Sequence, residues 1–152
     1  MLFCTQQNKH FLQNKEIITV DSHYETDIFQ DKYLWMKTKY RELINPDYDE
    51  HQALIWGWPT REEALYYFED MPTTSCIIIA EIPDKDVLVT DFYGWHNVLN
   101  NYDPKYWDTI LNEKDMRQNG LLEENEVFTP QLVTDHLDKS NIIDIIYKQE
   151  KD

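Results

Sequence analysis

Hydrophobic positions in the middle of the chain form runs that predict strands. Residues 53–58 are apolar and rich in β-forming side chains, and Pro59 ends the run. Residues 76–80 are apolar at every position, whereas a strand with one wet face would alternate. A continuous apolar run therefore predicts a strand that is covered on both faces. A second short strand is predicted at residues 87–89.

Other segments carry helical spacing or helix-capping residues. Residues 28–44 repeat apolar side chains at spacings of three, four and seven, which predicts an amphipathic helix. Thr60, with Glu63 three residues later, is typical of the start of a helix. Further helices are expected over residues 95–99 and after Asp103-Pro104, where Asp caps and Pro occupies the first turn.

The remaining segments complete the expected fold class. Additional strands are predicted at residues 1–5, 17–20 and 142–147, with another starting at Val127-Phe128. Residues 112–126 are the least apolar part and predict a loop with a stop at Gly120. We therefore expect an α+β fold in a single domain, residues 1–152, with helices packed on a mixed, mainly antiparallel sheet of about five to seven strands.

Composition and charge narrow the choice of partners. Apolar residues make up 41% and aromatic residues 14% of the chain, which indicates a folded protein. The net charge of −15 disfavours nucleic acid and anionic membranes, which are polyanions. It fits either a solvated surface that aids solubility or a surface that binds a basic protein. No apolar run is long enough for a membrane helix and no signal peptide is visible, so a cytoplasmic location is expected.

The number and spacing of the Cys, His and Gly residues argue against several kinds of site. Cys4 and Cys76 lie in apolar, strand-like contexts, so reduced and buried thiols are predicted. The five His residues lack metal-ligand spacing, and no metal site is expected. With 3 Gly in the chain, no glycine-rich phosphate loop can be built.

Three segments resemble an uncharacterised family of small bacterial proteins known only as a domain of unknown function. The segments are residues 33–36 (Tyr-Leu-Trp-Met), residues 55–58 (Ile-Trp-Gly-Trp) and residues 87–100, which contain Asp-Phe-Tyr-Gly-Trp-His. The resemblance covers roughly residues 1–102 and implies a bacterial or phage origin. It implies no activity.

A second resemblance concerns the order of the elements. A strand ending in an aromatic and a Thr, a helix with an Ala-Leu-Tyr-Tyr face and an apolar strand ending Glu-Ile-Pro are similar to the middle of ADP-ribosyltransferase-fold proteins. In those enzymes the catalytic Glu commonly lies just before or at the start of a late strand, in a context that Glu126 matches. The resemblance implies that Glu126 is catalytic: it would hold a ribose hydroxyl of NAD and stabilise an oxocarbenium-like state.

The same resemblance implies a cofactor site for NAD. The first-strand motif falls at Thr5, and the second motif falls at Trp58 and Thr60. Those enzymes usually place an Arg or His near the first motif, and this chain has neither before His10. Arg41 is a separate candidate, because its guanidinium could hold an anionic ligand bidentately.

Each candidate also has a structural interpretation. Glu126 could belong to a solvated acidic loop, Trp58 could be a core aromatic, and Arg41 could pair with a nearby Glu. His96 could act as a general base, or it could hydrogen-bond inside a structural turn.

Two hypotheses follow, and they leave open whether the chain is an enzyme. The first is a small ADP-ribosyltransferase-like protein that binds NAD and modifies a macromolecular target, with a protein as the expected target. The alternative is a non-enzymatic acidic interaction or inhibitor protein of the nucleic-acid-mimic type.

Overall fold

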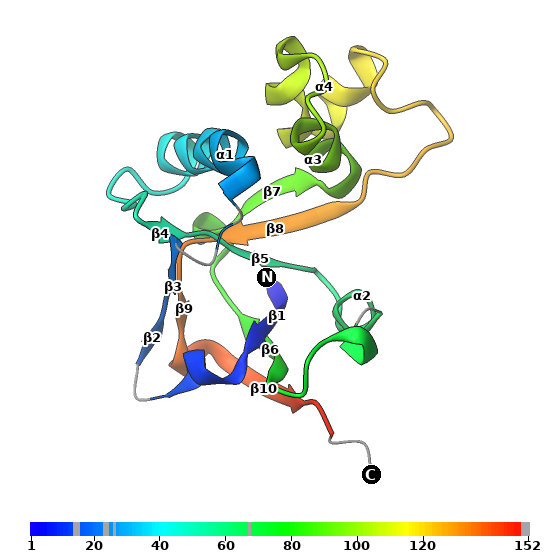
Figure 1. The fold of residues 1–152 in the computed structure, drawn as a ribbon. Coiled ribbons are helices and arrows are strands. Elements are labelled where there is room, and N and C mark those ends of the chain that lie inside the picture. The colour runs from blue at the N-terminus through cyan, green and yellow to red at the C-terminus, as the bar shows by residue number, and fades with distance from the viewer. Residues whose placement is uncertain (14–15, 23–24, 26, 67, 150–152) are drawn as a thin grey trace.

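The computed structural model describes residues 1–13, 16–22, 25, 27–66 and 68–149 (Figure 1). The strands are β1 (Leu2–Asn8), β2 (Ile17–Ile18), β3 (Val20–Asp21), β4 (Gln52–Ala53), β5 (Ile55–Gly57), β6 (Ser75–Glu81), β7 (Leu88–Asp91), β8 (Pro130–Thr134), β9 (Leu137–Asp138) and β10 (Ile142–Tyr147). The α-helices are α1 (Gln30–Leu43), α2 (Arg61–Leu65), α3 (Phe92–Leu99) and α4 (Glu113–Gln118). Short 3-10 helices are η1 (Lys9–Leu12), η3 (Asp27–Phe29), η4 (Phe68–Asp70), η5 (Asp84–Asp86), η6 (Pro104–Leu111) and η7 (Lys139–Asn141).

The main strands form two three-stranded antiparallel sheets. One has the order β1-β6-β10 and the other β5-β8-β7. The two sheets meet through their edge strands β1 and β5, at an isolated bridge between Cys4 and Trp58. There the Cys4 N–H donates to Trp58 O at 2.9 Å and the Trp58 N–H donates to Cys4 O at 2.7 Å. The strand sequence in space is therefore β7-β8-β5-β1-β6-β10, and the α+β class with antiparallel pairing is confirmed.

Strand β6 is covered on both faces, as its continuous apolar run predicts. Ile77, Ile78 and Ile79 are each 0% exposed. Ile78 points into a cluster with Phe3 and other apolar residues between the sheets, whereas Ile77 and Ile79 pack with Ala64 and Phe68 near α2. The alternation of a strand sends neighbouring side chains to opposite faces, so a strand buried on both faces needs apolar residues throughout.

A glycine permits the close contact between the two sheets. A Cβ added to Gly57 would lie 2.6 Å from the ring of Phe3, closer than real carbon contacts. Phe3 is 0% exposed and cannot turn aside into solvent. Gly57 therefore lets β5 approach β1 at the point where Trp58 follows.

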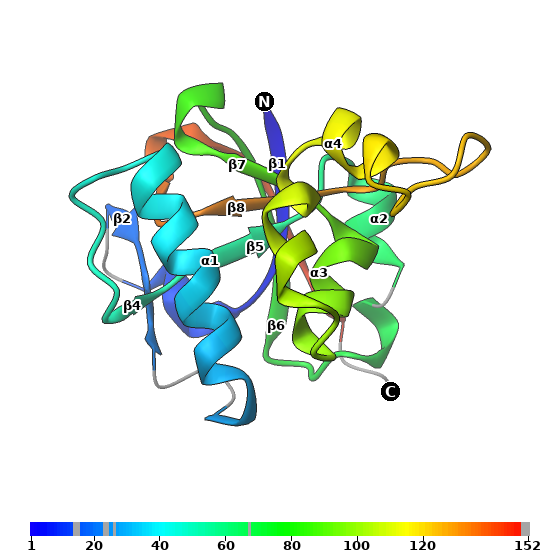
Figure 2. The same ribbon diagram turned by 90° about the horizontal axis from the view of Figure 1, so that it is seen from above.

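Helices α1 and α3 cover the same side of the β5-β8-β7 sheet (Figure 2). Their apolar residues meet those of the sheet in one core cluster, which contains Met36, Tyr40, Trp95, Val98 and Val133. The short helix α2 lies beside the other sheet (Figure 1), and its N-terminus is capped as predicted. The Thr60 hydroxyl oxygen accepts the Glu63 N–H at 3.3 Å and donates to the Glu63 carboxylate at 2.9 Å.

Two expectations from the sequence are wrong. Residues 113–118 form helix α4 where a loop was expected: Asn112 caps it and Met116, 2% exposed, anchors it. Strand β8 begins at Pro130, whereas Val127 lies outside any strand and is 78% exposed. The predicted stop at Gly120 is confirmed by its φ of 71°, a left-handed conformation that favours glycine.

Both cysteines are free and buried, as predicted. Burial raises the pKa of the Cys4 thiol to about 11, which keeps it protonated and unreactive at neutral pH. Within the described ranges no helix has the length and apolar character needed to cross a membrane.

Candidate functional site

The bridge between Cys4 and Trp58, which we call the sheet joint, brings Thr5 of β1 close to Trp58, which directly follows β5. Thr5 follows Cys4, whose backbone pairs with that of Trp58. Thr5 is 0% exposed, and its hydroxyl donates to Trp56 O at 2.6 Å while accepting from Gln7 Nε2 at 2.9 Å. The Thr5 hydroxyl therefore holds neighbouring groups in place and does not itself face a ligand.

Trp58 lies between the sheet joint and the start of α3. Its ring is half-buried, and its centroid lies 4.9 Å from that of Phe92 at an interplanar angle of 47°. The Phe92 N–H donates to Thr129 O at 2.8 Å, so the residues that lead into β8 lie directly beside α3. Trp58 is thus a packing residue between Phe92 of α3 and the core cluster that contains Cys4 and Ala64.

A buried aspartate ties the same region together. Asp91 is 2% exposed. Its Oδ2 accepts the Gly94 N–H at 2.7 Å, which caps α3, and its Oδ1 accepts the Thr129 N–H at 2.9 Å. One carboxylate therefore fixes the helix start and the approach to β8 relative to each other.

Glu126 stands three residues before Thr129 in the exposed segment that leads into β8. Its carboxylate accepts the Glu123 N–H at 3.1 Å, and its carbonyl oxygen accepts from Arg117 Nη2 at 2.9 Å. The carboxylate is accessible to solvent and held in a local turn. Antiparallel pairing, with Gly57 opposite Leu132, puts the start of β8 beside the end of β5, and Glu126 stands four residues before that start in a segment that projects outward (Figure 1).

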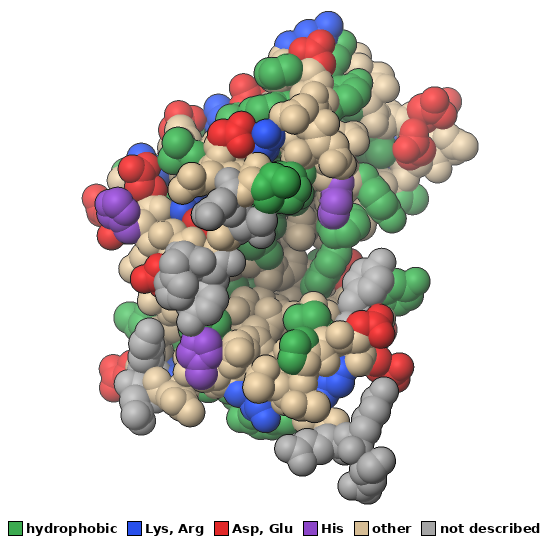
Figure 3. Space-filling model, in the orientation of Figure 1, with side chains coloured by type: hydrophobic (Ala, Val, Ile, Leu, Met, Phe, Trp, Pro, Cys, Tyr) green, Lys and Arg blue, Asp and Glu red, His purple; other side chains and the backbone are tan. Residues whose placement is uncertain are grey.

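A cavity of about 220 Å³ opens where β1 and β5 separate beyond Trp58. It is lined by Gln6, Gln7, Val20, Glu25, Tyr33, Ala53, Leu54 and Trp56. The space-filling view shows a hollow at the middle of the molecule, between the half that holds α1 and α3 and the half that holds β1 and β6 (Figure 3). We refer to this lined space as the inter-sheet cavity.

Aromatic rings make one wall of the inter-sheet cavity rigid. Trp56 stacks on Trp95 of α3 with ring centroids 4.9 Å apart and an angle of 24°. Tyr33 of α1 packs on the same Trp95 ring at 6.0 Å. Burial, and to a lesser degree the nearby Glu25 carboxylate, raises the pKa of the Tyr33 phenol, so that this group stays neutral.

Arg41 lies away from the sheet joint. It stands eight residues after Tyr33 on α1, roughly 12 Å along the helix axis. Its Nε donates to Tyr48 O and its Nη2 to the Glu50 carboxylate, both at 3.2 Å. This supports the structural interpretation of a paired arginine.

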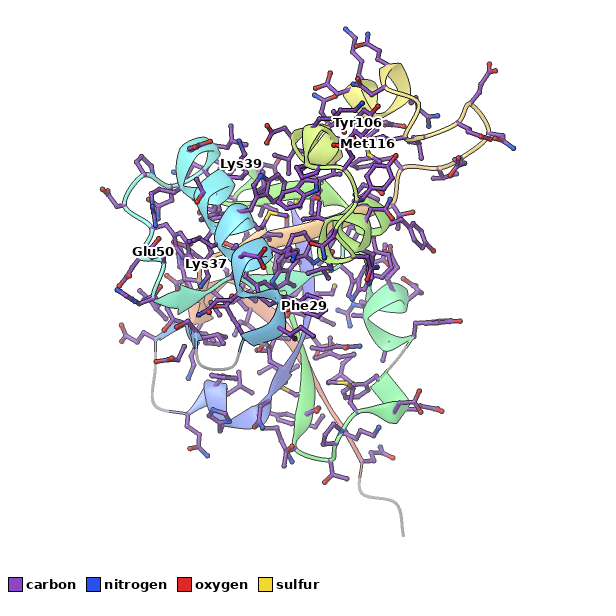
Figure 4. All side chains as sticks on the ribbon, turned by 45° about the horizontal axis from the view of Figure 1, so that its top comes forward. Phe29, Lys37, Lys39, Glu50, Tyr106 and Met116 are labelled. Carbon is purple, nitrogen blue, oxygen red and sulfur yellow. The ribbon has the colours of Figure 1, made fainter. Side chains whose placement is uncertain are left out.

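A second, larger cavity of about 410 Å³ lies beside α1, and three of its eight described lining residues are acidic, namely Glu25, Asp31 and Glu50. Lys37 is 6% exposed there and bonds the Glu25 carboxylate at 2.5 Å and Glu50 O at 2.9 Å. Figure 4 shows Lys37 and Glu50 close together on this side of α1. The lysine ties the loop before β4 to the helix, and its charge is matched by these acceptors.

Two other candidate residues, Thr60 and His96, make hydrogen bonds within their own helices. The Thr60 hydroxyl caps α2, as described above. His96 Nδ1 lies 2.8 Å from Phe92 O, one turn earlier on α3, which corresponds to the structural-turn interpretation of this histidine.

Gln131 of β8 is a polar residue that the sequence analysis did not select. It is 9% exposed, and its Oε1 is buried with no hydrogen-bond partner among the described residues. It shares a sheet face with Val133, two residues away, and therefore with Trp56, which pairs with Val133. Strands β5 and β8 thus place a buried amide and two tryptophans on one face.

At the opposite end of β8, Asp135 and His136 form a hydrogen-bonded pair. Asp135 Oδ1 lies 2.6 Å from His136 Nδ1 and 3.0 Å from the Tyr40 hydroxyl, and Asn45 donates to Oδ2 at 2.9 Å. Burial alone would raise the pKa of Asp135, but the bonds from His136 and Asn45 outweigh it and lower that pKa. The bond to Asp135 raises the pKa of His136.

The structure brings together Thr5 and Trp58, whereas the Glu126 side chain bonds within its own exposed segment and Arg41 pairs with Glu50 beside α1. The residues that sequence reasoning missed are Gln7, Tyr33, Trp56 and Gln131. Trp56 had a usable signal, because it precedes Trp58 by two positions and so shares its strand face. Among the described residues, no group of three or more His, Cys, Asp or Glu is placed to hold a metal ion.

Comparison with known proteins gives one match. A family described as a domain of unknown function (DUF3841) matches residues 1–142, nearly the whole chain. No curated protein and no solved structure shows significant similarity.

Proposed function

Since this chain belongs to the family described as a domain of unknown function (DUF3841), its activity has to be argued from its own site. We propose that it is a small ADP-ribosyltransferase-like protein. It binds NAD in the space between its two sheets and transfers ADP-ribose to a macromolecular target, with a protein as the expected acceptor. The fold-level part of this proposal is an analogy, and the site carries the rest.

One observation carries the proposal: strands β1, β5 and β8 are neighbours. Three motifs far apart in the sequence lie on or near them: Thr5 is on β1, Trp58 directly follows β5, and Glu126 stands four residues before β8. Antiparallel pairing of β5 with β8 puts the end of one beside the start of the other. This adjacency supports a common site formed by the three segments.

In the proposed reaction the bond between nicotinamide and the ribose C1′ breaks, and nicotinamide leaves with the bonding electron pair. A nucleophilic atom of the target forms the new bond to C1′ and loses its proton to solvent or to a nearby base. Glu126 accepts a hydrogen bond from a ribose hydroxyl and stabilises the positive charge that develops on the sugar. Its exposed position in the turn before β8 leaves it accessible to such a ligand.

The alternative of an acidic interaction protein rests on the net charge of −15. A nucleic-acid mimic needs its carboxylates gathered on one face, where they can imitate a row of phosphates. On the face seen in Figure 3, the Asp and Glu side chains are spread around the edges, with Lys and Arg between them. This face therefore presents no row of carboxylates of the kind a mimic would need.

The test combines calorimetry with NAD and a nicotinamide-release assay on wild type, Glu126→Gln and Glu124→Gln. Glu126→Gln keeps the side-chain oxygen that accepts the Glu123 N–H but removes the charge. We expect it to lower turnover by about 10²-fold or more, as for the loss of one electrostatic stabiliser. NAD affinity should be nearly unchanged, because the lost interaction belongs to the transition state.

Glu124→Gln is the matched control, since Glu124 is exposed in the same segment and should have little effect. If NAD fails to bind at millimolar concentration, the cofactor proposal is wrong and the acidic interaction protein becomes the better account. Binding without nicotinamide release would mean that the chain holds NAD without using it as a substrate.

A further inference from the structure

We propose that Asp144, held by Arg61, closes the free edge of β10 against pairing with β10 of a second copy of this chain. Strand β10 stands at the end of the order β1-β6-β10, so among the described residues one of its two edges is paired and the other is not. An edge strand of this kind is a template on which another strand can add. The role of Asp144 concerns association of the chain, and it does not depend on NAD or on the proposed reaction.

The sequence of β10 suits it to pair with another copy of itself. Residues 142–147 read Ile-Ile-Asp-Ile-Ile-Tyr, with neither Pro nor Gly. Six-residue segments that combine high β-propensity with low net charge are the ones that join most readily into intermolecular sheets. Asp144 is the single charged residue of this strand, and a charge in or beside such a segment is a common means of preventing that pairing.

The hydrogen-bond pattern shows which backbone groups of β10 point outward. The Lys148 N–H, directly after the strand, donates to Ser75 O of β6 at 3.4 Å and therefore points inward. Backbone groups of successive residues in a strand alternate between its two edges, and the register is regular after the bulge that lies between Ile142 and Asp144. The N–H groups of Ile145 and Tyr147 consequently point away from β6, towards any strand that would add there.

The Asp144 side chain covers part of this outer edge. Its Oδ1 accepts the Ile145 N–H at 2.9 Å, and its Oδ2 accepts from Arg61 Nη1, at the start of α2, at 2.8 Å. The bond from Arg61 lowers the pKa of the Asp144 carboxyl, which therefore stays charged at neutral pH. An incoming strand would have to displace this carboxylate before it could bond to the Ile145 N–H.

The second copy is the partner that the edge fits by symmetry. In an antiparallel pair of β10 strands centred on Ile145, Ile143 of each copy would lie opposite Tyr147 of the other. These side chains are 58% and 53% exposed, so pairing would cover apolar surface that water now reaches. The two Asp144 carboxylates would become diagonal neighbours, about 7–8 Å apart, and their like charges would oppose the pairing. Because each copy would use the same edge, association would stop at a dimer.

The test is sedimentation equilibrium on the full chain, at physiological ionic strength, where charges are screened beyond about 8 Å. It compares wild type, Asp144→Ala and Asp47→Ala. Asp144→Ala frees the Ile145 N–H and removes the one charge of the strand, so its average mass should rise with concentration from that of one chain towards that of two. Wild type should remain a single chain. Asp47→Ala should behave as wild type, since Asp47 is exposed in the loop after α1 and its loss changes the net charge equally.

The double variant Asp144→Ala/Tyr147→Pro checks that the dimer forms through β10. Proline removes the outward Tyr147 N–H without taking a bond from β6, and edge strands tolerate proline. The double variant should therefore return to a single chain, with thermal unfolding as the check that each variant is folded. If it does not fold, hydrogen exchange decides: in Asp144→Ala, the Ile145 and Tyr147 amides should exchange more slowly as the protein concentration rises.

Three results would overturn the inference. The first is an Asp144→Ala protein that stays a single chain up to about 1 mM, a concentration at which even weak pairing is visible. The second is a wild type that dimerises as readily as Asp144→Ala. The third is a dimer that persists in the double variant or leaves the Tyr147 amide unprotected.

Discussion

The two sheets of the molecule have similar size and different contents. The central strand of the β1-β6-β10 sheet, β6, is buried from Ser75 to Ala80 and is apolar from Cys76 to Ala80. The central strand of the β5-β8-β7 sheet, β8, is equally well covered but buries Gln131 and Thr134. Strand β6 is filled with aliphatic side chains from Ile77 to Ala80, whereas the β5-β8 pair combines buried polar groups with Trp56 of β5.

This difference leads us to expect that β6 contributes mainly to stability, and β5 and β8 mainly to function. Buried polar groups lower stability unless they are paired, so a strand that carries unpaired ones stabilises the fold less than an apolar strand does. The β6 strand contains no such group after Ser75 and anchors two of the three core clusters. The β5-β8-β7 sheet carries the unpaired Gln131 oxygen and borders the inter-sheet cavity through Trp56. We therefore expect changes in β6 to act on folding, and changes in β5 and β8 to act on binding.

The largest expected effect is that of Ile78→Ala in β6. Ile78 is 0% exposed, and truncation leaves a cavity in a strand closed on both faces. The free energy of unfolding should fall by about 2–5 kcal/mol. Denaturant unfolding measures it, with Ile143→Ala as the control, because Ile143 of β10 is 58% exposed and its truncation should cost little. A fall below about 0.5 kcal/mol for Ile78→Ala, as for a surface change, would contradict the contrast between the sheets.

The second prediction concerns Gln131→Leu in β8. Leucine has a similar size and removes the buried oxygen that has no partner among the described residues. The free energy of unfolding should stay unchanged or rise by up to about 1 kcal/mol, because an unpaired buried acceptor is lost.

Thr134→Val is the matched comparison for Gln131→Leu. Its hydroxyl donates to Asp86 O at 3.0 Å, so its loss should lower the free energy of unfolding by about 1 kcal/mol. Thermal or denaturant unfolding separates the two cases. A marked loss of stability in Gln131→Leu would show that its amide is bonded and structural.

The smallest expected effect is that of His136→Gln on the way the free energy of unfolding changes with pH. The bond to Asp135 raises the folded pKa of His136, so its stabilisation is present below the unfolded pKa of about 6.5 and fades as pH rises through the folded pKa. The pKa of Asp135 is lowered, so its contribution is present above about pH 4 and is lost as pH falls. The pair should stabilise most between these values.

The free energy of unfolding is measured between pH 5 and pH 9 for both proteins. As pH rises, that of wild type should fall by up to about 1 kcal/mol more than that of His136→Gln. The effect is small because the His136 side chain is 39% exposed, so solvent screens its charge. Equal pH profiles for the two proteins would contradict a charged pair at the end of β8.

Much of the fold could be predicted from local pattern. The apolar run at residues 76–80 gave β6 and its double burial, and Thr60 gave the start of α2. Helix α4 was missed because Met116 is its one buried residue, although Asn112 was a readable cap. The start of β8 was placed too early, because pairing with β5 and β7, not the apolar character of Val127, decides where that strand begins.

The site could be predicted only in part. The motifs at Thr5, Trp58 and Glu126 were visible in the sequence, but the closeness of Thr5 to Trp58 and of the start of β8 to the end of β5 depends on the strand order, which no local pattern contains. The role of Thr5 could not be foreseen, because its hydroxyl is bonded to a carbonyl 51 residues later in the chain. Gln7 gained significance only through that bond.

The central claim is that a nucleotide binds between the two sheets, and the five Trp indole N–H signals test it directly. Trp56 lines the inter-sheet cavity and Trp58 lies at the sheet joint. Trp35 of α1 and Trp107 of η6 instead pack against each other, with centroids 5.8 Å apart, and neither lines that cavity. In NMR spectra assigned by single Trp→Phe variants, added NAD should shift the Trp56 and Trp58 signals saturably and leave Trp35 and Trp107 nearly unchanged. No saturable shift at millimolar NAD, or shifts confined to Trp35 and Trp107, would contradict the account.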